Sequence, residues 1–223
     1  MKVFTYIKDN SSRVPKKNFR NLCGLELWKH LVYELKDFDV YIDTDSEYVV
    51  KECVKDPLLS HVIAFEREQR FIDMENNKDN KLSPALLMVE NFLNKYAEDD
   101  EEIIVTHVTS PFLTSKTIND AVKKLNDYEF VHSVYSVQDF AWIGDNFNPL
   151  NFDPNVVQRT QDVDKVHFSN GGFFMFKKST FNKYKARLGP NTFYYELPRE
   201  ESIEIDTEED LRFAEILGRG LNG

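Results

Sequence analysis

Cysteine is scarce in this sequence, and long apolar runs are missing from it. The two cysteines, Cys23 and Cys53, lie far apart and belong to no C-x-x-C or metal-binding spacing. This excludes a disulfide framework and is typical of a reducing compartment. No stretch has the pattern of a membrane-spanning helix or a signal peptide, and no segment repeats, so we expect a cytoplasmic protein.

Positive charge is also in deficit. Lysine and arginine number 28 against 38 aspartates and glutamates, which gives a formal net charge of −10. This balance argues against nucleic acid or an anionic membrane as the main partner, and any anionic ligand must be met by a local basic site. The hydrophobic fraction of 41%, with 13% aromatic residues, excludes disorder as the main state of these 223 residues.

Residues 3–18 join an apolar stretch to a basic one. Val3–Ile7 is rich in β-branched and aromatic residues and predicts a buried strand. The loop that follows combines small polar residues with four cations, Lys8, Arg13, Lys16 and Lys17. Because ligands of α/β proteins bind at the carboxyl ends of strands, the loop is either a polyphosphate cradle or a solvated basic loop. These residues alone do not distinguish the two interpretations.

The rest of the chain alternates strand and helix patterns, which predicts an α/β fold. Strands are predicted over residues 39–42, 61–65, 103–108, 129–137, 170–176, 193–196 and 202–206. Helices are predicted over residues 26–36, 47–54, 85–96, 115–125, 179–188 and 207–217. We also expect a long polar loop over 66–81, an irregular aromatic stretch over 138–169 and a frayed tail over 218–223.

Two acidic side chains near the end of the chain form a candidate metal site. In a strand over 202–206, Glu204 and Asp206 point to one face while Ile203 and Ile205 point to the other. Magnesium commonly uses one or two carboxylates together with substrate phosphates. The alternative is that Asp206 caps the final helix and Glu204 faces solvent. The residues alone favour this alternative.

Residues 7–18 resemble the signature A-R-G-G-S-K-R-I-P-G-K-N of the cytidylyltransferases that activate acidic sugars, especially the acylneuraminate (CMP-sialic acid) synthetases. Five positions match, namely Ser11, Arg13, Pro15, Lys17 and Asn18. The signature's arginine and two glycines are replaced by Lys8, Asp9 and Asn10. Lysine cannot form the two-pronged arginine–phosphate contact, and glycine allows the closest approach of backbone to a ligand.

Four later segments resemble the family in the same order. The matched pairs are 43–46 (DTDS) with S-T-D, 107–113 with Q-P-T-S-P-L-R, 170–175 with N-G-A-I-Y-I, and 203–211 (IEIDTEEDL) with I-D-I-D-T-E-x-D-L. Glu204 replaces an aspartate of the family and keeps its charge. His107 replaces a glutamine that helps to hold the sugar in the family, so the acceptor is expected to differ. Alternatively, His107 is a core histidine.

The family also places an arginine and a serine near the nucleotide base. Arg67 and Ser83 occupy the matching positions, although Arg70 competes with Arg67. Ser83 is also a good N-cap for the helix that follows it, and Asp45 or Ser46 for the helix that follows them. Capping is the favoured role for Asp45 or Ser46, with proximity to the ligand in addition, and it is the alternative to a contact with the base for Ser83.

The resemblance implies a three-layer α/β/α nucleotidyltransferase with a Rossmann-like, mixed, mostly parallel sheet, in a single domain over residues 1–217. Residues 138–169 would be a dimerisation extension that completes the sugar site of a partner subunit. The implied reaction transfers CMP from CTP to a 2-keto-3-deoxy sugar acid and releases pyrophosphate, with Mg²⁺ as cofactor. The implied partners are CTP, an acidic sugar and a second copy of the chain, without nucleic acid or membrane. The alternatives are another sugar acid, such as Kdo, or a non-catalytic nucleotide-binding module.

The resemblance also implies a role for each matched residue. The catalytic residues would be Lys17, Arg13 and Asp206. The nucleotide would contact Lys8, Ser11, Asn18, Arg67 and Ser83, and the sugar would contact His107, Thr109, Ser110, Asn170 and Gly171. The metal ligands would be Glu204 and Asp206. The general base is open between a metal-bound hydroxyl and an acid such as Asp45.

Overall fold

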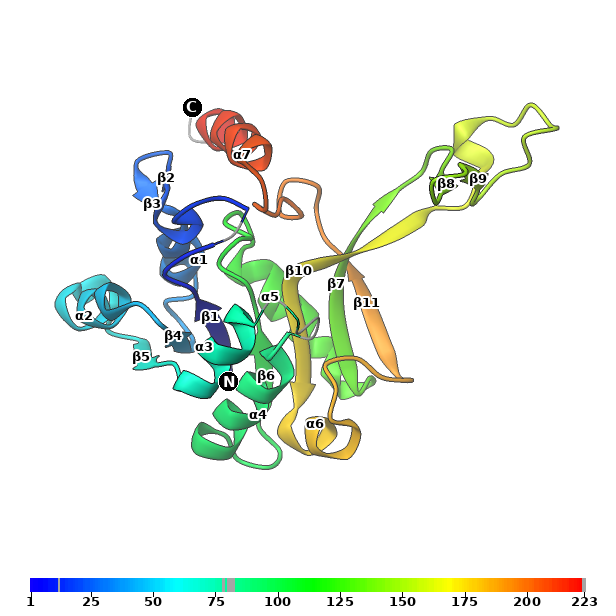
Figure 1. Ribbon diagram of the computed structural model, residues 1–223. Helices are drawn as coiled ribbons and strands as arrows, with labels where there is room; N and C mark the ends of the chain where they lie inside the picture. The colour runs from blue at the N-terminus through cyan, green and yellow to red at the C-terminus, as the bar shows by residue number, and fades with distance from the viewer. Residues whose placement is uncertain (12, 78, 80–82, 222–223) are drawn as a thin grey trace.

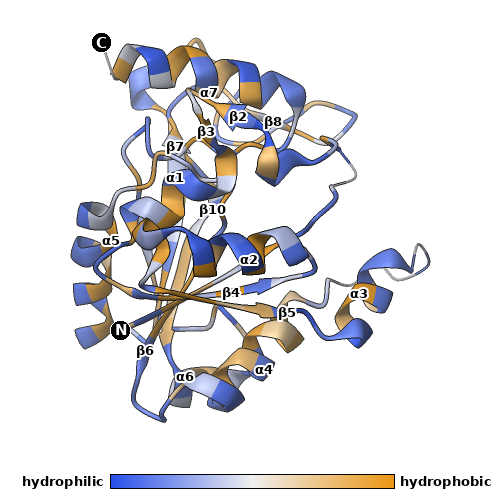
Figure 2. Cartoon of the chain, turned by 90° about the vertical axis from the view of Figure 1, so that its left-hand side faces the viewer, coloured by the Kyte–Doolittle hydropathy of each residue, from blue (hydrophilic) through white to orange (hydrophobic). Residues whose placement is uncertain are grey.

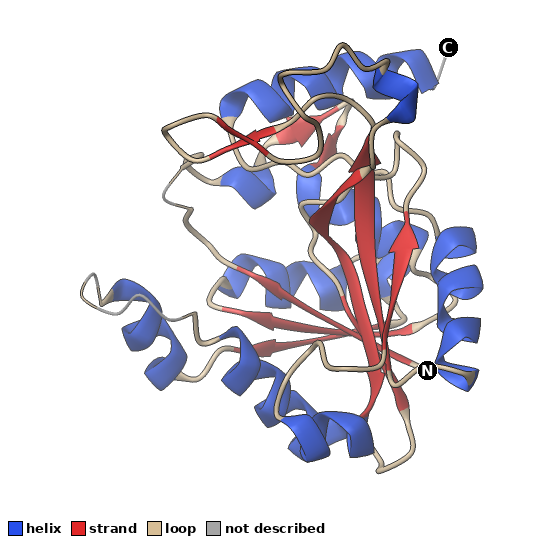
Figure 3. Cartoon of the chain, turned by 90° about the vertical axis from the view of Figure 1, so that its right-hand side faces the viewer, coloured by secondary structure: helices blue, strands red, loops and turns tan. Residues whose placement is uncertain are grey.

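The computed structural model describes residues 1–11, 13–77, 79 and 83–221 and is built on a central seven-stranded sheet. Its strands lie in the order β11-β7-β10-β6-β1-β4-β5. Their bounds are β1 Lys2–Ile7, β4 Asp39–Thr44, β5 Val62–Glu66, β6 Glu102–Val105, β7 Phe130–Val137, β10 Val166–Lys177 and β11 Thr192–Glu196. β10 runs antiparallel to both of its neighbours, whereas the other pairs in this sheet are parallel. The predicted mixed, mostly parallel sheet is therefore confirmed (Figure 3).

Helices cover both faces of the sheet. Their bounds are α1 Leu27–Glu34, α2 Glu47–Lys55, α3 Gln69–Asn76, α4 Ala85–Tyr96, α5 Ser115–Val122, α6 Lys178–Tyr184 and α7 Glu208–Leu221. Side chains of β1 alternate between the faces: Val3 and Ile7 join the core under α1, α2 and α5, and Phe4 joins the core under α4 and α6. This confirms the predicted three-layer α/β/α arrangement (Figure 1). Within the described ranges, no helix has the length and apolar character needed to cross a membrane.

The C-terminal helix α7 packs on the beginning of the chain. Leu211 and Ala214 of α7 form a small core with Leu22 and Leu27. Leu22 belongs to the short hairpin of β2 (Asn21–Leu22) and β3 (Leu25–Glu26), which lies beside α7 in Figure 2. Because of this packing, the segment before α7 lies near the loop that follows β1.

The frayed tail predicted from residue 218 is not observed, because α7 continues through Leu221. Gly218 is buried in this helix, and a Cβ atom at its position would lie 2.7 Å from Cys23 Sγ. Glycine at position 218 therefore allows the helix to approach the β2–β3 turn closely. The glycines of residues 218–223 were the reason for predicting a tail instead of a helix. Residues 222–223 lie outside the described residues.

A long ribbon projects from the sheet between β7 and β10 (Figure 1). The last residues of β7 pair with the first residues of β10, and the far part carries two short strands, β8 (Trp142–Ile143) and β9 (Asn148–Pro149). β10 thus begins earlier than the strand predicted at residue 170. Trp142 and Phe147 are 53% and 74% exposed, so these aromatic side chains are not used by the core of the described chain.

Two segments fold differently from the sequence prediction. Residues 69–76, predicted as part of a polar loop, form helix α3, which Phe71 anchors in the core under α4. Residues 202–206, predicted as a strand, pair with no strand among the described residues. A backbone hydrogen bond of 2.9 Å from Ile205 N to Thr109 O holds this segment instead.

Arg67 ties β1, β4 and α3 together from inside the fold. Its side chain is fully buried, with Nε donating to Asp43 Oδ1 at 2.6 Å and Nη1 donating to Glu75 Oε2 at 2.9 Å. Nη2 donates to the carbonyl oxygen of Ile7 at 3.3 Å. Burial raises the pKa of Asp43, and the Arg67 guanidinium acts against that rise. Arg67 therefore secures the end of β1, from which the basic loop leaves.

Replacing Arg67 with methionine should lower the free energy of unfolding by about 3–5 kcal/mol, because the buried carboxylate of Asp43 loses its cation. Arg70→Met is the matched control: Arg70 is 64% exposed and pairs with Glu68, so its loss should cost no more than about 1 kcal/mol. Urea unfolding followed by circular dichroism measures both. An Arg67→Met protein as stable as the wild type would contradict this structural role.

Candidate active site

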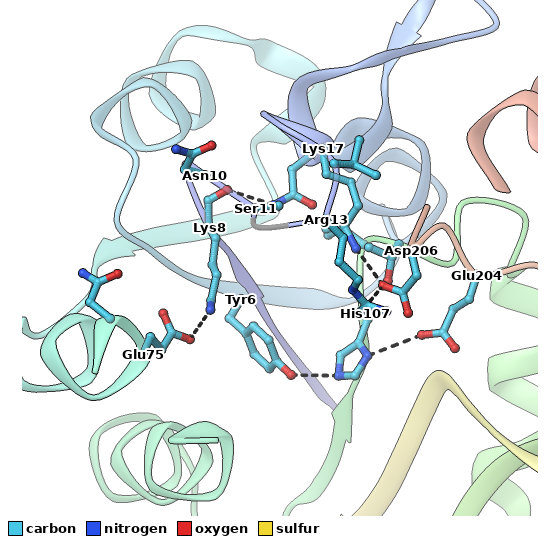
Figure 4. A pocket seen from close by; sticks show the side chains of 15 residues that line it. Tyr6, Lys8, Asn10, Ser11, Arg13, Lys17, Glu75, His107, Glu204 and Asp206 are labelled. Carbon is cyan, nitrogen blue, oxygen red and sulfur yellow. Dashed lines mark hydrogen bonds and ion pairs between the residues drawn. The ribbon is translucent and has the colours of Figure 1, made fainter. Parts of the chain in front are cut away.

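An open pocket of about 640 Å³ lies where β1 and β6 end. Its walls come from the loop after β1, the residues after β6, the C-terminal part of α3 and the segment before α7 (Figure 4). The pocket brings together nine of the predicted site residues, namely Lys8, Ser11, Arg13, Lys17, Asn18, His107, Thr109, Glu204 and Asp206. The other lining residues are Tyr6, Asn10, Val14, Glu75, Asn76 and Val108. The site thus lies at the sheet edge that the sequence indicates.

Lys17 and Asp206 join the two ends of the chain in this pocket. Lys17 Nζ donates to Asp206 Oδ1 at 2.9 Å and to the carbonyl oxygen of Ile205 at 2.9 Å. Arg13 Nη2 lies 3.0 Å from the same carboxylate oxygen of Asp206. Burial acts to raise the pKa of Asp206, but the hydrogen bond and charge of Lys17, together with Arg13, outweigh it and hold that pKa below its usual value. Asp206 is therefore ionised at neutral pH.

The final helix does not need Asp206 as its cap. Thr207 and Asp210 form a reciprocal capping pair, in which Thr207 N donates to Asp210 Oδ2 at 2.8 Å and Asp210 N donates to Thr207 Oγ1 at 3.1 Å. The capping interpretation of the Asp206 side chain is therefore wrong. Thr207 and Asp210 leave the carboxylate of Asp206 free to face the pocket.

The basic loop is held in shape by its own polar side chains. Asn18 is buried, and its Nδ2 donates to the carbonyl oxygen of Lys8 at 2.9 Å, which closes the loop on itself. Asp9 replaces a glycine of the signature, and its carboxylate accepts hydrogen bonds from Lys16 and from Ser46 Oγ. Asp9 N donates to Asp45 Oδ1 at 2.6 Å. The loop is therefore anchored to the turn before α2.

These contacts correct the predicted role of the D-T-D-S segment. Ser46 occupies the N-cap position of α2, but its side chain makes no capping hydrogen bond there. Ser46 and Asp45 bind Asp9 instead. The two side chains thus position the loop next to the pocket without lining it.

Glu204 is fixed on the other side of the pocket. Its Oε2 accepts a hydrogen bond of 3.0 Å from Gly171 N, and its Oε1 lies 3.8 Å from His107 Nδ1. A Cβ atom at Gly171 would lie 2.1 Å from Glu204 Oε1, so this close approach requires glycine. Asn170 does not line the pocket; it is buried, and its Nδ2 donates to the carbonyl oxygen of Ser202. Asn170 and Gly171 therefore position the segment that carries Glu204.

The sequence prediction missed Tyr6 and Glu75. Tyr6 OH and His107 Nε2 lie 3.0 Å apart at the base of the pocket (Figure 4). Glu75 Oε1 lies 3.0 Å from Lys8 Nζ. Tyr6 could have been found from its position near the end of β1, but Glu75 depends on helix α3, which the sequence did not indicate.

Besides Asn170 and Gly171, three predicted site residues do not line this pocket. Arg67 is fully buried in its ion pairs with Asp43 and Glu75. Ser83 Oγ accepts a hydrogen bond of 3.2 Å from Ala85 N at the start of α4, as the capping interpretation expects. Ser110 is fully buried, and its Oγ atom has no hydrogen-bond partner among the described residues.

Two acidic residues of the pocket carry the type of oxygen donor that Mg²⁺ prefers. Within the described residues, no group of three or more His, Cys, Asp and Glu side chains is arranged to hold a metal ion. Glu204 and Asp206 both face the pocket. Because Mg²⁺ is typically held by one or two carboxylates, substrate phosphates and water, these two oxygen donors fit an ion that arrives with a nucleotide.

Comparison with characterised proteins gives relatives over nearly the whole chain. N-acylneuraminate cytidylyltransferase of Streptococcus agalactiae serotype V is 24% identical over 230 residues, which cover 95% of this chain and 51% of that protein. N-acylneuraminate cytidylyltransferase B of Danio rerio is 28% identical over 93% of this chain and 49% of its own length. The chain thus spans about half the length of these relatives. Pseudaminic acid cytidylyltransferase of Campylobacter jejuni is 23% identical over 94% of this chain and 92% of its own length.

Solved structures and a family model agree with these relatives. A CMP:2-keto-3-deoxy-manno-octonic acid synthetase complexed with CTP has a TM-score of 0.64 at 12% identity and covers 98% of both chains. A 4-diphosphocytidyl-2C-methyl-D-erythritol synthase has a TM-score of 0.65 at 8% identity, covering 97% of this chain and 98% of the other. At these identities the likeness shows the fold. The model of the cytidylyltransferase family matches residues 9–220, and the chain therefore belongs to that family.

Proposed function

We propose that this chain transfers CMP from CTP to a 2-keto-3-deoxy sugar acid of the sialic-acid type and releases pyrophosphate. The observation that carries the proposal is the 2.9 Å contact of Lys17 with Asp206, which places the basic loop and the acidic segment at one pocket. The N-acylneuraminate and pseudaminic acid cytidylyltransferases among its relatives support the class of acceptor. Kdo and other sugar acids are the alternative acceptors.

In this proposal the basic loop binds the triphosphate. Lys8, Arg13 and Lys17 offer cations at the pocket, and Ser11 and Asn18 lie beside them. In the structure these cations are paired with acids, Lys8 with Glu75 and the other two with Asp206. A triphosphate would exchange these partners for phosphate oxygens, and Lys17 and Arg13 would stabilise the charge on the leaving pyrophosphate.

Glu204 and Asp206 would hold Mg²⁺ at the same pocket. When bound, the ion would offset charge on the phosphate oxygens during attack at the α-phosphorus. Asp206 is 42% exposed as a side chain, so it is accessible to a metal–nucleotide complex. Glu204 is kept near it by Gly171 and faces His107. The acceptor would then bind on the His107 side of the pocket.

We also propose that the ribbon between β7 and β10 forms the interface of a homodimer. Trp142, Ile143, Phe147 and Leu150 are each 49–74% exposed on this projection. A cluster of exposed apolar side chains of this kind typically marks an interaction surface. The second copy would bury side chains that the described chain leaves in solvent.

Changing Lys17 to alanine should lower the rate of pyrophosphate release by roughly 100- to 1000-fold, because one preorganised donor to the reacting phosphates is lost. Lys36→Ala, at an exposed position at the end of α1, is the control and should retain full activity. The measurement is pyrophosphate release from CTP with a panel of sugar acids. Unaltered turnover in Lys17→Ala would refute its role, and CTP binding without release in the wild type would identify a non-catalytic binding module.

Changing Asp206 to asparagine should raise the Mg²⁺ concentration needed for half-maximal activity by roughly tenfold or more, the effect expected when a charged interaction worth about 1.5–3 kcal/mol is removed. Asp120→Asn is the control, because Asp120 pairs with Lys123 on α5, away from the pocket. A magnesium titration that coincides with that of the wild type would exclude Asp206 as a metal ligand.

Changing Trp142 to glutamate should convert a dimer into a monomer, because a charge would be buried in an apolar interface. Val54→Glu serves as the control, since Val54 is 87% exposed on α2 and lies outside the ribbon. Light scattering at micromolar concentration measures the mass of both variants. A wild-type protein that is monomeric under these conditions would contradict the proposed interface.

A further inference from the structure

Arg187 is a partly buried cation without an anionic partner. It lies in the loop between α6 and β11, and its Nη1 atom is shielded from solvent and has no hydrogen-bond partner. Among the arginines of the described ranges, Arg199 and Arg212 also lack a carboxylate within salt-bridge distance, but both are exposed. A shielded charged donor without an acceptor is costly. Such a group is expected where a ligand supplies the acceptor.

Arg187 belongs to a group of basic and aromatic side chains on the face of the sheet that α4 and α6 cover. Its guanidinium carbon lies 4.1 Å from the centre of the Phe174 ring. The His132 ring stacks on the same phenyl ring, with centroids 4.3 Å apart and planes at 17°. Arg187 and His132 thus both contact the ring of Phe174.

This stack adjoins the wall of the candidate active site. Arg187 lies beside the hydroxyl group of Tyr6, where its charge opposes the effect of burial, which raises the pKa of that hydroxyl. Tyr6 OH is 3.0 Å from His107 Nε2, and both side chains line the pocket (Figure 4). The His107 ring also lies 6.2 Å from the ring of Phe174. Arg187 is therefore next to the part of the pocket that carries Tyr6 and His107.

The charge balance separates Arg187 from the other cations of the site. Lys8 is paired with Glu75, and Arg13 and Lys17 are paired with Asp206. Arg187 has no such partner within the described part of the chain. Glu75 and Glu204 act electrostatically on its neighbours Tyr6 and His132, but Glu75 is paired with Lys8 and Glu204 faces His107. A planar guanidinium group matches the two oxygens of a carboxylate better than any other cationic side chain does.

We propose that Arg187 binds the carboxylate of the acidic sugar and so selects acids over neutral sugars. The inference rests on the proposed function, because it assigns a recognition residue to the acceptor of that reaction. The carboxylate would supply the acceptor that Nη1 lacks, next to Tyr6 and His107. Arg187 acts in binding the acceptor, and it makes no contact with the triphosphate.

The test compares Arg187→Gln with the wild type in steady-state kinetics, using N-acetylneuraminate and its methyl ester as acceptors. Arg187→Gln should raise the KM for the acid by roughly ten- to a hundredfold, the loss expected for one charge-assisted hydrogen bond, and should leave the KM for CTP unchanged. The ester should bind the wild type as weakly as the acid binds the variant, with no further loss in the variant. Arg187→Lys should recover part of the affinity for the acid. Arg212→Gln, at an exposed position on α7, is the matched control.

The outcomes separate this inference from the proposed function. An unchanged KM for the acid in Arg187→Gln, or an equal loss for acid and ester, would overturn the role of Arg187 while turnover by the wild type upholds the reaction. If the wild type turns over no sugar acid, the proposed function fails, and binding of N-acetylneuraminate is then measured by saturation-transfer NMR. Binding of N-acetylneuraminate to the wild type that is lost in Arg187→Gln supports a carboxylate site. Absent or equal binding in both proteins overturns it.

Discussion

The contact between Lys17 and Asp206 is the constraint on which the arrangement of the pocket depends. It joins residues from opposite ends of the chain at 2.9 Å. The helix that follows Asp206, α7, packs against the β2–β3 hairpin, which follows Lys17. The hydrogen bond from Ile205 to Thr109 fixes the same acidic segment to the loop after β6. Three separate parts of the chain thus meet at the carboxyl ends of β1 and β6.

The pocket is charged but internally neutralised. The cations of the basic loop face acids of α3 and of the C-terminal segment, and burial does not prevent Asp206 from staying ionised because Lys17 and Arg13 accompany it. Such a site is prepared for a ligand that carries both signs of charge, as a magnesium–triphosphate complex does. Arg187 is not paired with any of these acids. We therefore infer that it binds a different anionic group from the triphosphate.

The sequence predicted the parts of the fold that depend on local patterns. The alternation of strands and helices and the basic loop after β1 follow from short-range periodicity and composition. The convergence of Lys17 with Asp206 came from the family resemblance, since their separation in sequence hides it from any local pattern. The loop's departures at Asp9 and Asn10 could be seen in the sequence, but the anchoring of Asp9 by Asp45 and Ser46 could not.

The errors arose where tertiary contacts override local sequence. Helix α3 has few apolar side chains, and burial of Phe71 stabilises it. Because this helix was not predicted, Glu75 was not recognised as a residue of the site. Arg67 matched a family position, but its ion pairs with Asp43 and Glu75 bury it completely. The acidic segment before α7 is held by separate hydrogen bonds, from Ile205 N to Thr109 O and from Lys17 Nζ to Ile205 O, instead of strand pairing. Arg187 is noticeable only when its missing partner is seen in three dimensions.

A crystal structure of the protein with CTP and Mg²⁺ would test the central claim most directly. The triphosphate is predicted to lie between the basic loop and Asp206, with Lys17 Nζ in contact with a phosphate oxygen and the metal ion bound to Asp206. A nucleotide bound elsewhere, with the contact between Lys17 and Asp206 unchanged, would contradict it.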